Sequence, residues 1–239
     1  MIYVTGDLHG DISSLPYFCE ANHTTTDDIL VVLGDAGFNY YGGKKDRELK
    51  EEASKLPITL LCIHGNHEIY PLHLPSYEQT DFCDGRVFVE PQFPNLLFTV
   101  NGSVYNLNGS KAIAIGGAYS VDKHYRIERG YRWFEHEQSG LLERNNVEAS
   151  LDKIGWSVDY VFTHTAPRKY EPIEWFLGVI DQSTVDKSTE DWLDSIENRL
   201  EYKQWFCGHY HGNKDIDKIS FLFNGYKVLD PVLKALAAG

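Results

Sequence analysis

The chain has 239 residues, of which 42% are hydrophobic, 24% charged and 13% aromatic, and this composition excludes a disordered or collagen-like polypeptide. At roughly 150 residues per domain, the length is sufficient for one or two domains with a substantial core. Lys and Arg number 22 and Asp and Glu 35, so the formal net charge is −13, which disfavours a protein that holds long nucleic acids by neutralising their phosphates.

Targeting signals and cofactor motifs narrow the possibilities further. No stretch approaches the roughly 20 apolar residues that cross a bilayer, and no signal peptide opens the chain, so we expect a cytoplasmic protein without a membrane partner. The four cysteines, Cys19, Cys62, Cys83 and Cys207, have no CxxC spacing, so neither disulfides nor a structural zinc site are expected. No G-x-G-x-x-G motif opens a helix, which argues against a nicotinamide cofactor.

Five apolar runs of strand length, rich in β-branched residues and bounded by Gly, Asp or His, predict buried strands. They are Ile2–Thr5, Ile29–Leu33, Ile58–Ile63, Val158–Phe162 and Trp205–Cys207. Two segments between the early runs are helical in composition: Ile12–Ala21, with Asp11 as its predicted N-cap, and Lys44–Leu56, which Pro57 closes. The first third is therefore predicted as strand, helix, strand, helix, strand, the order of an α/β protein.

The stretch from Gly85 to Ala118 predicts an antiparallel meander, because prolines and two Asn-Gly pairs, at 101–102 and 108–109, separate short β-prone segments. These segments are Arg86–Glu90, Leu96–Val100, Val104–Leu107 and Lys111–Ile115. Charged helices are predicted at about Glu135–Ile154 and Thr184–Arg199. The chain then ends with a predicted strand pair, Ile219–Phe223 and Tyr226–Leu229, and a short Ala-rich tail.

Potential ligand side chains follow the carboxyl ends of all five predicted buried strands. The clusters are Gly6-Asp7-Leu8-His9, Gly34-Asp35, His64-Gly65-Asn66-His67-Glu68, His164 and Gly208-His209-Tyr210-His211. One such cluster alone is more often a cap or a turn than a ligand, but five in order, four of them with an adjacent Gly that lets the backbone turn, are hard to produce by chance. Because sites in open α/β sheets form outside the carboxyl ends of strands, we expect the clusters to converge on one rim.

The residue types at this rim predict a metal centre. Imidazoles, carboxylates and one amide oxygen suit Mn²⁺, Fe²⁺ or Zn²⁺ better than Ca²⁺. A single cation could not use so many ligands, whereas two ions about 3.5–4 Å apart, joined by a bridging carboxylate, could. Asp35 is the predicted bridge. Two divalent ions would also leave a local positive excess over the two aspartates, which binds phosphate even on an acidic protein.

The five clusters, with Thr163 before His164, resemble the five motif blocks of the calcineurin-like metallophosphoesterase superfamily. The blocks run from residue 7 to residue 211, which predicts one catalytic domain over residues 1–239. The resemblance implies a two-sheet α/β sandwich flanked by helices. It also implies that Asp7, His9, Asp35 and His211 hold one ion, that Asp35, Asn66, His164 and His209 hold the other, and that Mn²⁺ is the favoured metal.

The same resemblance implies a reaction. A hydroxide bridging both ions would attack the phosphorus in line, while His67, which is not a ligand in the family, would protonate the leaving oxygen or stabilise the transition state. Asn66 and His67 would also contact the phosphate.

The sequence departs from the protein Ser/Thr phosphatase branch after its second block. That branch continues Gly-Asp-x-x-Asp-Arg-Gly, where the later Asp orients the catalytic His and the Arg holds phosphate, but here those positions are Phe38 and Asn39. Asp11 is one candidate to orient His67. Arg126, in the segment 116–126 that resembles one in bacterial and phage members, is the candidate phosphate ligand, because a guanidinium pairs bidentately with phosphate oxygens. The alternative interpretation is a solvated loop of balanced charges.

Two further assignments stay open. The aromatic run Tyr131-Arg132-Trp133-Phe134 is interpreted either as a wall of the substrate pocket or as ordinary packing. His64, at a strand end beside the site, is interpreted as a hydrogen-bonded structural residue.

The leading functional hypothesis is metal-dependent hydrolysis of a phosphate ester, a small molecule or a phosphoprotein, and Glu68 favours phosphomonoesters because the protein phosphatase branch has Glu there. The first alternative is a phosphodiesterase or nuclease acting on cyclic nucleotides, dinucleotides or single-stranded nucleic acid. The second, a non-catalytic metal-dependent scaffold, is disfavoured because all seven ligand positions are present. The sequence does not determine the oligomeric state or the substrate.

Overall fold

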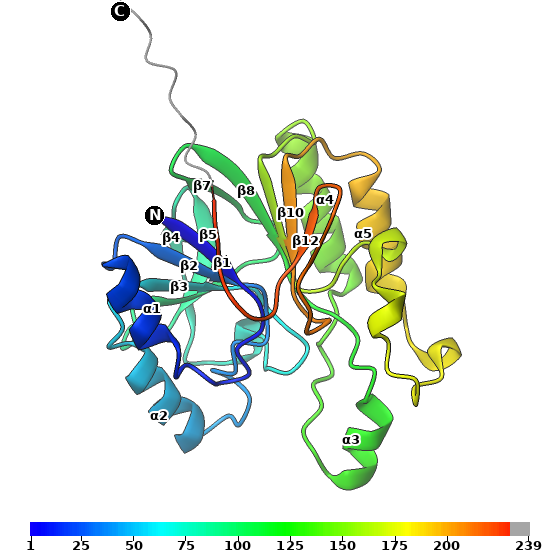
Figure 1. The fold of residues 1–239 in the computed structure, drawn as a ribbon, viewed down its shortest axis with the longest axis horizontal. Coiled ribbons are helices and arrows are strands. Elements are labelled where there is room, and N and C mark those ends of the chain that lie inside the picture. The colour runs from blue at the N-terminus through cyan, green and yellow to red at the C-terminus, as the bar shows by residue number, and fades with distance from the viewer. Residues whose placement is uncertain (230–239) are drawn as a thin grey trace, which may run out of the picture.

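The computed structural model describes residues 1–229, and the predicted Ala-rich tail lies outside this range. Within it, two β-sheets pack face to face with helices on both outer faces (Figure 1), which confirms the predicted two-sheet α/β sandwich. The helices are α1 (Leu15–Asn22), α2 (Lys44–Ala53), α3 (Lys123–Arg129), α4 (Leu141–Lys153) and α5 (Ser188–Glu197). None of the helices in residues 1–229 is long and apolar enough to span a bilayer.

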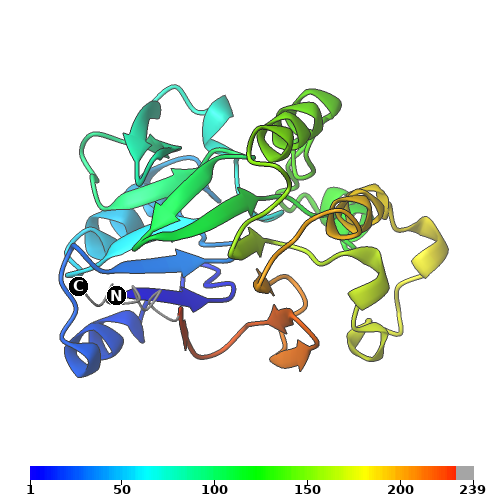
Figure 2. The same ribbon diagram turned by 90° about the horizontal axis from the view of Figure 1, so that it is seen from above.

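The first sheet has seven strands within the described range. In spatial order they are β13 (Lys227–Val228), β1 (Ile2–Thr5), β2 (Ile29–Val32), β3 (Thr59–Cys62), β6 (Leu96–Thr99), β5 (Gly85–Val89) and β4 (Glu78–Phe82). The central strands β1, β2, β3 and β6 are parallel, and the outer strands are antiparallel to their neighbours. In Figure 2 the blue arrows of β1 and β2 accordingly point the same way.

The second sheet follows the same plan with six strands in residues 1–229. In spatial order they are β11 (Lys214–Ile216), β12 (Ile219–Phe221), β10 (Gln204–Cys207), β9 (Tyr160–Thr163), β8 (Ser110–Ile115) and β7 (Val104–Leu107). Strands β12, β10, β9 and β8 are parallel. The five strands that precede the ligand clusters, β1, β2, β3, β9 and β10, therefore all belong to the parallel centres of the two sheets.

Side-chain alternation along the central strands explains the layers, because successive strand residues point to opposite faces of a sheet. Ile2 and Val4 of β1 pack into a core between the two sheets, whereas Tyr3 packs with Leu15 and Phe18 beneath α1. A third core joins the outer face of the second sheet to α4 and α5. Three layers of apolar packing thus fix the strand ends relative to one another.

The expected meander from Gly85 to Ala118 is wrong at its middle connection. Strands β4, β5 and β6 form one antiparallel unit and β7 pairs with β8, but the chain changes sheets between β6 and β7. The Asn101-Gly102 pair marks this crossing, where the Asn101 side chain accepts from the Gly116 amide and donates to Ser139. The Asn-Gly pair therefore lies at the connection between the two sheets, held by long-range hydrogen bonds, and not in a hairpin turn.

Three other expectations need correction. Ile219–Phe223 and Tyr226–Leu229 do not pair, because β12 lies beside β10 whereas β13 joins β1 in the other sheet. Helix α1 begins at Leu15 rather than after Asp11, since Ser14 holds the N-cap position and Pro16 fits the first turn. Helix α4 begins at Leu141, six residues after the expected start, because the segment from residue 135 packs irregularly beside Gly116–Ser120.

Candidate metal and substrate site

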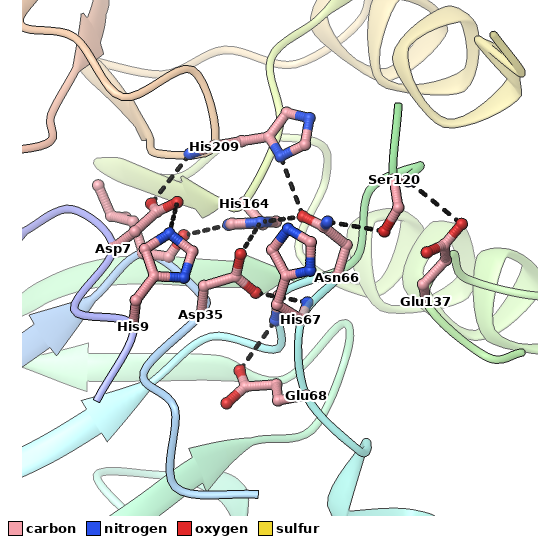
Figure 3. Close-up of polar contacts among 12 residues, drawn as sticks. Asp7, His9, Asp35, Asn66, His67, Glu68, Ser120, Glu137, His164 and His209 are labelled. Carbon is pink, nitrogen blue, oxygen red and sulfur yellow. Dashed lines mark hydrogen bonds and ion pairs between the residues drawn. The ribbon is translucent and has the colours of Figure 1, made fainter. Parts of the chain in front are cut away.

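The loops that follow β1, β2, β3, β9 and β10 bring the predicted ligand side chains to one rim (Figure 3). Asp7 and Asp35 are buried, as are Asn66 and His164, whereas His9 and His211 are exposed at the mouth of the site. The structure brings all seven predicted ligand residues together, along with His67.

The first group of ligand atoms consists of Asp7, His9 and His211. The Nε2 atoms of His9 and His211 lie 2.9 Å apart, and they lie 3.7 Å and 3.3 Å from Asp7 Oδ2. Asp7 Oδ2 is buried without a hydrogen-bond partner among the described residues, while Oδ1 accepts from the His209 amide. A buried carboxylate oxygen with no hydrogen-bond partner, facing two imidazole nitrogens, suits a cation held between the three side chains.

The second group centres on Asp35 and His164. His164 Nε2 lies 3.5 Å from Asp35 Oδ2 and 2.8 Å from Asn66 Oδ1, and His209 Nδ1 lies 3.0 Å from the same Asn66 oxygen. His164 Nδ1 donates to the Leu33 carbonyl at 2.7 Å, which leaves Nε2 free to face the site. Carboxylate, amide and imidazole donor atoms again meet at one point.

The carboxylate shared by the two groups is Asp7 in this structure, since Asp7 also groups with Asp35 and His164. Asp35 belongs to one of the two groups only. Its Oδ1 accepts from the His67 amide at 2.7 Å, which fixes the carboxylate against the loop after β3. The assignment of Asp35 as the bridging ligand stays a prediction.

The backbone of the rim is strained and closely packed. Four ligand residues, His9, Asp35, His209 and His211, have φ between 47° and 64°, a region that non-glycine residues rarely adopt. A Cβ on Gly65 would lie 2.0 Å from Asp35 Oδ1, and one on Gly208 would lie 2.2 Å from Asp7 Oδ1. These two glycines, neither of which has a positive φ, therefore make room for the carboxylates rather than allowing a turn.

The two buried carboxylates, Asp7 and Asp35, shift the pKa values of the histidines around them. Burial alone would lower the pKa of His164, but Asp35 and Asp7 raise it to about 9. Against the effect of burial, the same ion pair with His164, helped by His67 and His9, holds the pKa of Asp35 well below its usual range. Desolvation and the nearby His164 hold the pKa of His209 well below its usual value. A positive charge is thus favoured beside Asp35, where divalent cations would replace the proton on His164.

These observations fit the pair of divalent cations that the ligand types predict. The Asp7 oxygen without a hydrogen-bond partner, the converging imidazole nitrogens and the Asp35 carboxylate can each donate an electron pair to a divalent ion. The residues that would hold the ions are the seven predicted ones.

Ser120 and Glu137 support the site and were missed at the sequence level. Asn66 Nδ2 donates to Ser120 Oγ at 2.9 Å, which turns the amide oxygen toward the imidazoles, and the Ser120 amide donates to Glu137 Oε1 at 3.2 Å. Figure 3 shows this chain of contacts leading away from the ligands. Residues this far from a ligand block carry no local signal, although Ser120 lies in the segment singled out for its resemblance to bacterial and phage members.

His67 and Arg126 meet at the pocket mouth. Arg126 Nη2 lies 3.5 Å from His67 Nε2, and its Nε donates to both Asp122 carboxylate oxygens at 2.8 Å. Tyr40 and the Arg132 carbonyl accept from Nη1 at 3.3 Å and 3.4 Å. Residues 123–129 form a helix rather than the solvated loop of the alternative interpretation, and this helix projects away from the sheets in Figure 1. Asp11 instead accepts from the Ser13 amide, so Arg126 is the charged side chain that faces the His67 ring.

Glu68 and His64 lie beneath the rim. Burial, together with Asp35, raises the pKa of Glu68 to about 8, and its Oε1 accepts from the Gly65 amide. Burial lowers the pKa of His64 to about 3, and its ring packs 4.5 Å from that of Tyr70. The His64 ring is hydrogen-bonded to the backbone of Glu68, as expected of a structural residue, while its Nε2 has no hydrogen-bond partner within residues 1–229. Both groups support the loop after β3 from below.

A pocket of about 1040 Å³ opens from the rim. Asp35, Asn66, His67 and Arg126 line one part of it, and aromatic, aliphatic and polar residues from other segments line the rest. The residues of the run 131–134 are not among the lining residues, so the interpretation of this run as the pocket wall is wrong. Trp133 instead donates to Glu137, and Phe134 packs against Tyr40.

The chain is similar to known proteins in sequence and in fold. Residues 1–213 match the family described as calcineurin-like phosphoesterase. The solved structure of TT1561 from Thermus thermophilus superposes with a TM-score of 0.53 at 14% identity, covering 94% of this chain and 88% of that one. The phosphopantetheinyl hydrolase PptH from Mycobacterium tuberculosis gives a TM-score of 0.45 at 15% identity, covering 93% and 87%. No curated protein matches the chain.

Proposed function

Because the chain belongs to the calcineurin-like phosphoesterase family, we propose that it hydrolyses phosphate esters, phosphomonoesters above all, with two divalent metal ions held at the strand-end rim. The observation that carries the proposal is the convergence of seven ligand side chains from five separate loops around two buried aspartates. Structural ion pairs do not need four imidazoles and two carboxylates within one cluster.

Asp7, His9, Asp35 and His211 would hold one ion, and Asp35, Asn66, His164 and His209 the other, with Mn²⁺ favoured over Fe²⁺ and Zn²⁺. When bound, such ions neutralise phosphate oxygens and acidify water, so that hydrolysis proceeds at neutral pH by in-line attack. The chain's own contribution to ion binding is preorganisation, because strained backbone at four ligands and Ser120 behind Asn66 fix the donor atoms before the ions bind.

His67 and Arg126 act on the phosphate. The Arg126 guanidinium, held at Nε by Asp122, presents its Nη2 toward His67 and into the pocket, where it would bind phosphate oxygens. His67 would donate a proton from its ring to the leaving oxygen. Burial and the neighbouring Arg126 lower the pKa of His67 despite the opposing effect of Asp35, so its imidazolium gives up a proton readily.

Phosphomonoesters are favoured because Arg126 adds a second positive group to the ions, which suits a dianion better than the monoanion of a diester. Glu68, which favoured monoesters at the sequence level, is fully buried, so its contribution is to the loop rather than to the substrate. Cyclic nucleotides and other diesters remain the competing substrate class.

Two broader assignments belong with this proposal. We propose that residues 1–239 form one domain, which is supported by the pairing of β1 with β13 from opposite ends of the chain. We also propose a cytoplasmic location, which the four free cysteines of the described range support, because a reducing compartment keeps thiols free.

Substitution of Asp35 by Asn tests the function. If Asp35 bridges the ions, Asp35→Asn lowers both metal content and hydrolysis of an aryl phosphate by roughly 100-fold or more. Even the loss of a residue that only hydrogen-bonds to a metal ligand lowers metal affinity or activity by about 10–100-fold. The control is Asp7→Asn, which makes the same change of side chain at the other aspartate and should lose one ion instead of two. Metal content by mass spectrometry after reloading with Mn²⁺, and initial rates, give both results.

Rates on an aryl monoester and the matching bis-aryl diester then separate the substrate classes. Faster monoester turnover supports the proposal and faster diester turnover overturns the monoester assignment. Unchanged rates in folded Asp35→Asn protein overturn the metal-dependent mechanism altogether.

A further inference from the structure

The pocket extends well beyond the space that a phosphate needs. Its volume of about 1040 Å³ reaches the upper end of the roughly 300–1,000 Å³ typical of pockets for whole small molecules. The part away from the rim is lined by residues of the segment 175–187, by Tyr210 and by Glu190 of α5. None of these belongs to the metal-binding set, so this part of the pocket, the distal subsite, is available for the alcohol portion of a substrate.

One wall of the distal subsite is aromatic. The rings of Phe176 and Tyr210 are nearly parallel, with an interplanar angle of 14° and centroids 6.5 Å apart. The Trp175 indole lies against the backbone of Gly212, where a Cβ would be 2.6 Å away, and so stands beside the ligand His211. Flat faces at the edge of a metal centre favour a planar group attached to the phosphate.

Two buried acceptor atoms on the lining residues have no partner. Glu190 Oε2 and Gln182 Oε1 lack a hydrogen bond within the described chain, while Glu190 Oε1 accepts from Thr165 Oγ1 at 2.8 Å. Glu190 is only 3% exposed, and burial raises its pKa to about 7. An unsatisfied buried acceptor destabilises the folded protein, so a ligand that donates N–H groups to both atoms would recover stability that the protein alone lacks.

The surrounding charges favour a neutral donor over a cationic one. Lys187 Nζ lies 4.6 Å from the centroid of the Phe176 ring and 2.5 Å from Glu171 Oε1, so a cation already occupies this wall. Leu177, Ile180 and Val185 add apolar surface to the same lining. A guanidinium or ammonium group would meet Lys187 and lose its hydration against these side chains.

We propose that the distal subsite binds a nucleobase that carries N–H donors, so that the substrate is a nucleotide whose phosphate reaches the metal rim. The base would lie against Phe176, Tyr210 and Trp175 and donate to Glu190 and Gln182. This inference rests on the proposed phosphoesterase function for catalysis, but base binding itself does not require it.

Binding and catalysis test the subsite separately. Guanosine and adenosine, which have no phosphate, are titrated into the purified protein and followed by quenching of tryptophan fluorescence, with Trp175→Phe to identify the reporting indole. Hydrolysis of guanosine 5′-monophosphate is compared with that of ribose 5-phosphate. The test variant is Glu190→Gln, which places an N–H donor where the base donates, and the control is Asp191→Asn, the neighbouring exposed acid on the same helix.

We expect saturable quenching by a nucleoside, and a roughly 10-fold or larger loss of kcat/KM for the nucleotide in Glu190→Gln, because the amide N–H of the variant would face the N–H of the base and leave a buried donor unpaired. Ribose 5-phosphate turnover stays within about twofold, and Asp191→Asn resembles the wild type. Equal losses on both substrates, or quenching by arginine but not by nucleosides, overturn the inference. Absence of turnover on every ester, with nucleoside binding intact, would instead contradict the proposed function and leave the base site standing.

Discussion

The metal rim and the wall of the pocket are built in different ways. Asp7, Asp35 and His164 at the rim are buried at strand ends, and glycines that would clash if they carried a side chain hold them in place. The wall comes from Arg126 of α3, a helix with no buried residue, from the segment 175–187, where Leu177 is exposed, and from Tyr210 and Glu190.

This difference indicates that reaction and selectivity can be changed separately. A substitution at the rim disturbs packing, charge and ligand geometry together, so it should affect every substrate. A substitution in the wall disturbs ion pairs and ring contacts at a surface, so it should leave the fold intact and change rates only for some substrates. If the two regions are independent, substitutions in each should change different measured quantities.

Substitution of His67, the residue between rim and wall, has the largest expected effect. His67→Gln removes the proposed proton donor but keeps the backbone amide that donates to Asp35. We expect kcat to fall by roughly 10²–10⁴-fold on an alkyl phosphate, the usual contribution of general acid catalysis. The loss should be much smaller on a nitrophenyl phosphate, because its leaving group departs without a proton.

Metal content of His67→Gln should match that of the wild type, which distinguishes a proton donor from a ligand. Equal losses of rate on both esters would assign His67 to transition-state binding, and loss of an ion would place it in the rim after all.

Arg126 and Asp122 test the wall alone. Arg126→Ala should lower kcat/KM for a monoester by roughly 10–100-fold, since charge-assisted hydrogen bonds contribute about 1.5–3 kcal/mol. Asp122→Asn, which weakens the contact to Arg126 Nε, should raise KM several-fold with a smaller change in kcat. Glu128→Gln, an exposed charge on the same helix, is the matched control. An unchanged KM in Asp122→Asn would mean that Arg126 is positioned without it.

The sequence predicted the rim well because each ligand stands directly after a buried strand, and both features are local. The strands β1, β2, β3, β9 and β10 were placed to within one or two residues, and their common direction follows from parallel pairing. The pairing of β12 and β13 was wrong because two adjacent strand-like runs look the same whether they form a hairpin or join different sheets.

Apart from Arg126, which the sequence analysis named as the candidate phosphate ligand, the wall was not predicted, and the reason is physical. Helix α3 has no buried face in the described structure, so its sequence carries no apolar periodicity. Ser120 and Glu137 support Asn66 only because the fold brings 120 and 137 together behind it. The distal subsite depends on Glu190 and Gln182 lacking partners among residues 1–229, a property of packing that no sequence pattern encodes.

Glu190 provides the smallest and most selective test, because it belongs to the wall and yet is buried like the rim. Burial raises its pKa from the ordinary 4.5 to about 7, despite hydrogen bonding from Thr165 and the charge of Lys187. The folded state therefore favours the neutral carboxyl. This contribution to stability is fully present below pH 4.5, and it is lost as the pH rises through about 7.

Glu190→Gln removes this titration. The free energy of unfolding of the variant, relative to that of the wild type, should therefore increase by on the order of 3 kcal/mol between about pH 4.5 and pH 8. Urea unfolding at several pH values measures the difference, and Asp191→Asn should show no comparable trend. If the difference in unfolding free energy between Glu190→Gln and the wild type does not change with pH, other groups of the protein already stabilise the Glu190 carboxylate. In that case Glu190 Oε2 does not lack a hydrogen-bond donor. A rising difference would mean that the wall, like the rim, keeps a polar group ready for a ligand at the expense of stability.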